Sequence, residues 1–135
     1  MTKTKAASRP AIHMLEEEAE KLANLAISVE NRLPQVSDLL LGEIERATTH
    51  KPGKIGKDVV TMGASVTFVD DATGVERTVS LVYPPEADID AGRISILTPM
   101  GAGLIGLKTG QSINWPDRDG RTRKLTIREV EQAGG

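Results

Sequence analysis

The 135-residue sequence contains no cysteine and only three aromatic residues, Phe68, Tyr83 and Trp115. Without cysteine the chain can form no disulfide, no thiolate metal site and no thiol nucleophile, a composition that suits a reducing cytosol. With so few aromatic side chains it lacks the stacking surfaces on which single-strand-binding proteins hold bases. The hydrophobic core must therefore be built mainly from aliphatic side chains.

Excess charge and long apolar runs are also missing. The sequence has 17 Lys and Arg against 19 Asp and Glu, a net charge of −2, which makes no general case for nucleic-acid binding. No run approaches the about 18 apolar residues that span a bilayer, and the first ten residues lack the apolar segment of a secretory signal. We expect a cytoplasmic protein in which residues 1–10 are disordered, because small and polar side chains bury too little surface.

Two helices are predicted in the first third of the chain. Apolar residues recur at spacings of three and four, the pattern of a heptad seam, at Ile12, Leu15, Ala19, Leu22, Ala26, Val29 and Leu33. Pro34 ends this helix, and a second amphipathic helix is predicted over residues 35–47. Because the connection is short, the pair should form an antiparallel coiled-coil hairpin, an arm over residues 11–50. The stripe Leu39-Leu40-Leu41 is wider than the hairpin needs, so it should pack against the following domain or another chain.

The remainder of the chain has the alternation of a β domain. Glycine and proline break the periodicity in a predicted linker over residues 51–57. Strands are then predicted over residues 59–60, 64–69, 76–83, 94–97, 112–115 and 122–130. Thr98 and Pro99 supply the cap and first position of a short helix, with Lys108 in its last turn and Gly110 after it. The sequence therefore predicts an α+β domain over residues 58–135.

A family resemblance lies in the order TPMGAGLIGLKTGQSI, which the segments LVYPPEAD and ISIL precede. This order resembles the C-terminal domain of the bacterial Gre transcript-cleavage factors, and more closely a branch of that family, the regulators of nucleoside diphosphate kinase. The likeness covers about residues 58–130, and the helical segment before it fits more loosely. It implies an antiparallel, FKBP-like β domain with one short helix, preceded by a coiled-coil arm. Two departures are Gly103, where alanine is more usual, and Gln111, where an acidic residue is common.

The same resemblance implies binding to RNA polymerase near its secondary channel through Thr98, Pro99 and Met100, which match the family's Ser/Thr-Pro pair and its neighbour. In Gre cleavage factors a longer coiled coil ends in an Asp and a Glu that help to hold a catalytic metal. The corresponding tip here carries no closely spaced acidic pair and consists of Glu30, Asn31, Arg32, Leu33, Pro34 and Gln35. We therefore predict a monomeric, non-catalytic polymerase-binding regulator that uses no cofactor and no metal.

Two other functions remain open at this point. An adaptor that regulates nucleoside diphosphate kinase or another cytosolic enzyme would also need only a protein-binding surface. An FKBP-like prolyl isomerase or chaperone is less favoured, because it would need a proline pocket lined by aromatic side chains. A second candidate surface is basic and contains Arg121, Arg123, Lys124 and Arg128, which could steer an acidic partner or simply form a solvated strand face.

Three further patterns favour structural interpretations. Residues 101–106 fit G-x-G-x-x-G, but so short a helix allows no βαβ crossover, which favours glycines that pack the helix on the sheet. The carboxylates of Asp70 and Asp71, like those of Glu86, Asp88 and Asp90, fall in predicted turns, where such groups bond to local backbone. His13 and His50 lie near the base of the hairpin and could approach one another, but two ligands do not make a zinc site.

Overall fold

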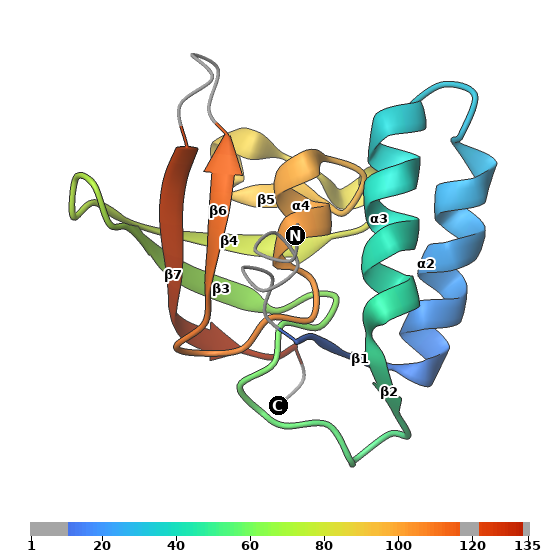
Figure 1. Ribbon diagram of the computed structural model, residues 1–135, viewed down its shortest axis with the longest axis horizontal. Coiled ribbons are helices and arrows are strands. Elements are labelled where there is room, and N and C mark those ends of the chain that lie inside the picture. Colours follow the sequence, from blue (N-terminus) through green and yellow to red (C-terminus); the bar gives the residue numbers. More distant parts are fainter. Residues whose placement is uncertain (1–10, 117–121, 134–135) are drawn as a thin grey trace, which may run out of the picture.

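The computed structural model describes residues 11–116 and 122–133. A helical hairpin lies along one side of a curved five-stranded sheet, and a short helix packs between them (Figure 1). In chain order the elements are β1 His13–Leu15, α2 Glu16–Ser28, α3 Pro34–Arg46, β2 Thr48–His50, β3 Ser65–Asp70, β4 Glu76–Val82, η1 Pro84–Glu86, η2 Ile89–Ala91, β5 Arg93–Ser95, α4 Pro99–Leu104, β6 Ser112–Pro116 and β7 Thr122–Glu131. This arrangement confirms the α+β class, with a helix pair followed by a sheet that carries one short helix. The predicted disorder of residues 1–10 lies outside the described residues.

The helical hairpin is shorter than the heptad pattern predicted. Pro34 opens α3 at its first position, close to the predicted start of the second helix. The first helix, however, begins at Glu16 and ends at Ser28, so the prediction of helix over residues 12–33 was wrong at both ends. Ile12 and Met14 are buried and alternate with half-buried neighbours, which is the period of a strand, and residues 29–33 form the turn between the helices.

A two-stranded parallel ribbon closes the base of the hairpin, which the sequence did not predict. β1 pairs with β2, with His13 opposite Thr48 and Leu15 opposite His50. The backbone N–H of His13 also donates to the carbonyl oxygen of Gly106 at 3.0 Å. The two ends of the hairpin are therefore tied to each other and to the segment that follows α4.

The main sheet has the strand order β5-β4-β3-β7-β6. The neighbouring pairs are antiparallel from β4 to β6, with a register shift in the β3–β7 pairing between Thr67 and Phe68, but β5 runs parallel to β4. The expectation of a purely antiparallel domain was therefore wrong at this edge. Residues 83–92 return the chain through the turns η1 and η2 before β5 begins, so the predicted loop contains two short 3₁₀ helices. Residues 59–60, predicted as a strand, form only an isolated bridge from Val59 to Lys108.

Helix α4 begins as predicted and ends earlier. The helix stops at Leu104, so the prediction that Lys108 lies in its last turn was wrong. The chain turns at Gly106, whose φ of 86° is open to glycine but strained for other residues, and Leu107 then enters the core. This turn brings Gly106 N–H to the carbonyl oxygen of Val60 at 2.9 Å and ties the segment after α4 to the segment before β3.

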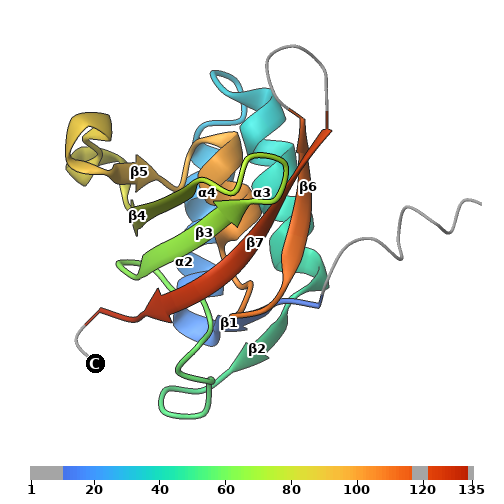
Figure 2. The same ribbon diagram turned by 90° about the vertical axis from the view of Figure 1, so that its left-hand side faces the viewer.

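One hydrophobic core joins the hairpin to the sheet. Its members include side chains from both helices of the hairpin and from the strands, such as Leu22, Ala26, Leu40, Val66, Leu81, Leu104 and Ile127. Figure 2 shows the sheet in front with α2 and α3 behind it. In the stripe at residues 39–41, Leu40 is fully buried, Leu41 packs against the core and Leu39 is 37% exposed. Leu40 and Leu41 therefore pack on their own domain, whereas Leu39 remains exposed. No helix in the described part of the chain has the length and apolar character to cross a membrane.

Candidate docking site and hairpin tip

The segment that opens α4 presents Pro99 to solvent. The Thr98 hydroxyl accepts a hydrogen bond from Gly101 N–H at 3.1 Å and donates one to the Ser95 carbonyl oxygen at 2.7 Å. Thr98 is therefore a helix N-cap, as predicted, and its polar atom is already occupied. Pro99 is exposed and Met100 half-buried. A partner at this surface would contact mainly the proline ring and part of the Met100 side chain.

The hairpin tip lies at the opposite end of the hairpin from the β1–β2 ribbon (Figure 1). The turn is closed by two hydrogen bonds to the Val29 carbonyl oxygen, from Arg32 N–H at 3.0 Å and Leu33 N–H at 2.7 Å. Leu33 is half-buried, and the other five residues that the sequence assigned to the tip are exposed: Glu30, Asn31, Arg32, Pro34 and Gln35. Glu30 is the one acidic residue among these six, and Asp38 lies one turn farther along α3.

The two described basic side chains predicted to form a surface on the last strand each lie close to a carboxylate. Arg128 Nη1 lies 3.0 Å from Glu76 Oε2, and Lys124 Nζ lies 3.9 Å from Asp71 Oδ2. Arg121 and the side chain of Arg123 lie outside the described residues. Because the two described cations each face a carboxylate across the sheet, they offer less attraction to an acidic partner than the sequence suggested.

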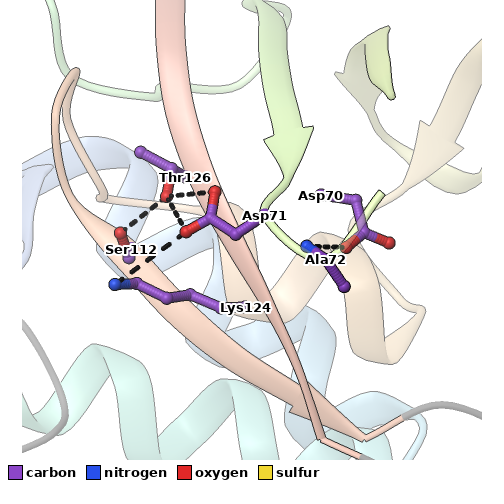
Figure 3. Close-up of polar contacts among 6 residues, drawn as sticks. All are labelled: Asp70, Asp71, Ala72, Ser112, Lys124 and Thr126. Carbon is purple, nitrogen blue, oxygen red and sulfur yellow. Dashed lines mark hydrogen bonds and ion pairs between the residues drawn. The ribbon is translucent and has the colours of Figure 1, made fainter. Parts of the chain in front are cut away.

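The paired aspartates Asp70 and Asp71 serve the turn after β3. An Asp70 oxygen accepts from Ala72 N–H at 3.0 Å, whereas the Asp71 carboxylate accepts from the Thr126 hydroxyl at 3.1 and 3.2 Å. In Figure 3 the two carboxylates point away from each other. The Thr126 hydroxyl also hydrogen-bonds to the Ser112 hydroxyl, with 2.9 Å between the two oxygens. The two groups therefore bind the turn and the strands, and do not converge on one ligand.

The histidines and the glycine motif also have structural roles. His13 Nδ1 and His50 Nε2 lie 3.0 Å apart across the β1–β2 ribbon, which confirms that the two side chains approach one another. A Cβ atom on Gly101 would fall against the Ser95 carbonyl oxygen and only 2.9 Å from Ile96 Cα. The glycine therefore lets α4 approach the chain after β5 closely, as the packing interpretation of the motif predicted. Within the described residues, no three His, Cys, Asp or Glu side chains are placed to hold a metal ion.

A pocket of about 340 Å³ escaped the sequence analysis. It lies where the first turns of α2 meet the end of β4, and its lining includes Glu18, Lys21 and Tyr83. Burial raises the pKa of Glu18, while a hydrogen bond from Met62 N–H at 3.2 Å and the charge of Lys21 act in the opposite direction. Burial, and then the charge of Glu18, raise the pKa of Tyr83. These residues come from distant segments, so no local pattern could have revealed the pocket.

Comparison with known proteins places this fold among the bacterial elongation factors. Residues 55–132 match the family described as "Transcription elongation factor, GreA/GreB, C-term". That match covers more than half of the chain, and the protein therefore belongs to the GreA/GreB family. The resemblance found in the sequence is thus confirmed.

Two individual relatives show how far the sequence similarity extends along the chain. The chain is 33% identical to the regulator of nucleoside diphosphate kinase of Escherichia coli K12 over 124 residues, which cover 92% of this chain and 91% of the relative. It is 39% identical to the transcription elongation factor GreA of Azorhizobium caulinodans, covering 77% of this chain but 63% of that factor. The similarity therefore spans nearly the whole length of the first relative and less than two thirds of the length of the second.

Solved structures support the fold. The prokaryotic transcription elongation factor GreA/GreB from Nitrosomonas europaea superposes with a TM-score of 0.74 at 35% identity, over 90% of this chain and 98% of that one. The Gfh1 protein of Thermus aquaticus reaches a TM-score of 0.51 at 19% identity, over 90% of this chain and 98% of that one, a likeness of fold alone.

Proposed function

We propose that this protein is a non-catalytic transcription regulator of the bacterial cytoplasm that binds RNA polymerase near its secondary channel. The observation that carries the proposal is similarity over nearly the full length of a regulator-type family member. The docking surface would be the start of α4, where the capped helix presents Pro99 to solvent beside Met100. Thr98 would act through its two hydrogen bonds by holding this proline in place.

The length of the hairpin and the residues at its tip support the proposal that this protein does not stimulate transcript cleavage. Each of its helices has 13 residues, which at about 1.5 Å per residue gives a length of roughly 20 Å. The helices also pack along the sheet domain, and Glu30 is the one carboxylate in the exposed turn. A short hairpin with one tip carboxylate would occupy the channel mouth without supplying a metal-holding acidic pair.

A second candidate function is an adaptor for a cytosolic enzyme. It is favoured by the name of one relative, the regulator of nucleoside diphosphate kinase. An adaptor would use the same kind of protein-binding surface as a polymerase-binding regulator. The two functions are therefore distinguished by which partner the protein binds. An FKBP-like isomerase receives less support, because Tyr83 is the single aromatic residue that lines the pocket beside α2.

Binding to purified bacterial core RNA polymerase tests the docking surface. We expect Pro99→Arg to weaken binding at least about tenfold, equivalent to about 1.4 kcal/mol, because a long charged side chain replaces a compact ring at the contact. Thr98 is left intact so that the N-cap survives. Ala72→Arg is the matched control, since it places the same side chain on an exposed turn at the far end of β3. Equal binding by Pro99→Arg and wild type would contradict the docking site, and no binding by wild type would favour the adaptor.

A transcript-cleavage assay on stalled elongation complexes tests the hairpin tip. We expect the wild-type protein to leave the rate of transcript shortening at the intrinsic level of the polymerase, because its tip lacks an acidic pair. A GreA-type cleavage factor serves as the positive control in the same complexes, and excess of this protein should reduce its effect if the two compete. Stimulated cleavage by this protein alone would overturn the non-catalytic assignment.

A further inference from the structure

The pocket beside α2 lies apart from the proposed docking residues and is lined by four separate segments. They are the start of the hairpin with the first turns of α2, the segment after β2, the segment before β3, and the end of β4 with η1. The lining comprises Leu15, Glu17, Glu18, Lys21, Pro52, Met62, Gly63, Val82, Tyr83 and Glu86. At about 340 Å³ it can enclose one long side chain of another molecule.

Its lining divides into an apolar floor and an acidic rim. Met62 and Val82 are buried below the pocket, and Leu15 is half-buried beside them. The rim carries three carboxylates against one ammonium group, Lys21. A site of this kind favours a ligand with an aliphatic stem and a positively charged head.

Two polar contacts show where such a head would sit. Met62 N–H donates to Glu18 Oε1 at 3.2 Å, which fixes the carboxylate at the edge of the apolar floor. The ammonium nitrogen of Lys21 lies 5.9 Å from the centroid of the Tyr83 ring, so this ring face already receives a cation from within the chain. Burial raises the pKa of Glu18, which agrees with a carboxyl group held at the edge of the apolar floor.

We propose that this pocket receives an arginine or lysine side chain of a protein partner, with its stem over Met62 and Val82 and its charged head between Glu18 and the Tyr83 ring. Arginine fits best, because its planar guanidinium can stack on an aromatic ring while it donates to a carboxylate. Lys21 occupies the ring face in the free protein and must yield when the partner side chain enters. The site is independent of the polymerase proposal, since it is defined on the free protein.

The test uses the full chain and the peptide acetyl-Gly-Arg-Gly-amide, followed by NMR. The amide signals of Met62 and Gly63 should shift with a Kd on the order of 1 mM, typical of one side-chain contact. The same peptide with citrulline, which keeps the shape and removes the charge, should bind at least fivefold more weakly. Glu18→Gln should weaken arginine binding by a similar factor, whereas Glu20→Gln, an exposed glutamate outside the pocket, should not change it.

Lys21→Met should strengthen binding of the arginine peptide, whereas Glu18→Gln should weaken it. Lys21→Met removes the competing cation and retains an apolar stem, so arginine-peptide binding should become about threefold tighter. Equal binding of the arginine and citrulline peptides, or shifts confined to amides away from the pocket, would overturn the proposal. Tighter binding of agmatine than of the peptide would also overturn it, by assigning the pocket to a small free cation.

Discussion

Gly101→Ala is expected to destabilise the folded protein by about 2–3 kcal/mol, although alanine is the better helix former. The added methyl group would fall against the Ser95 carbonyl oxygen and 2.9 Å from Ile96 Cα. All the nearest atoms belong to the backbone, so no side chain can move aside to make room. Relief would require α4 to shift away from the end of β5, which would disturb the buried residues Ala102 and Leu104.

Gly42→Ala is the matched control for this prediction, and it should change the free energy of unfolding in the opposite direction. Gly42 lies within α3, and a Cβ atom there would meet nothing within 4 Å. Alanine at this position should stabilise the protein by about 0.5–1 kcal/mol, because glycine loses more backbone entropy in a helix. Urea denaturation of both variants and wild type measures the difference in the free energy of unfolding. A stable Gly101→Ala variant would contradict the close packing of α4.

The expected loss of stability in Gly101→Ala also bears on the role of the glycine motif at residues 101–106. A phosphate-binding loop needs its glycines so that a ligand can approach, and alanine would then affect ligand binding more than folding. Here the space beside Gly101 is filled by the backbone of the same chain. At Gly106 a Cβ atom would lie 2.9 Å from Ile12 Cβ. Both glycines therefore bring segments of the fold together.

Local patterns predicted the elements that local chemistry determines. Thr98 and Pro99 mark the start of α4 through a side-chain cap and a fixed φ, and both effects act within one turn. Alternation located β3 and β4 to within about a residue at each end, because each has one face on the core. The acidic run Glu16–Glu18 marks the true start of α2, but the heptad spacing of Ile12 and Leu15 suggested a longer helix.

The features that sequence reasoning missed depend on contacts between distant segments. The β1–β2 ribbon joins three-residue strands that are far apart along the chain, too short for alternation to reveal. The parallel direction of β5 follows from how residues 83–92 fold back, not from the strand itself. In the candidate site, sequence reasoning placed both Pro99 and the Thr98 cap, but only the structure shows that Glu18 and Tyr83 line one pocket.

Leu40→Ala is expected to lower the free energy of unfolding by about 3 kcal/mol, within the range for truncated buried leucines. Leu40 is completely buried where α3 meets the core that also contains Val66, Leu81 and Leu104. Leu39→Ala is the control, since the neighbouring side chain is 37% exposed and its loss should cost less than about 1 kcal/mol. Both variants can be measured by urea denaturation at one temperature.

Two spectroscopic probes in this experiment test how the hairpin is connected to the sheet. Far-UV circular dichroism follows mainly the helices, whereas the NMR amide signals of β3 and β4 follow the sheet. Because one core spans both parts, Leu40→Ala should move the two transitions together to lower urea. A helix transition that moves while the sheet transition stays in place would mean that the hairpin unfolds separately. Coincident transitions would instead mean that the hairpin and the sheet unfold as one cooperative unit, so that the hairpin tip and Pro99 belong to the same folding unit.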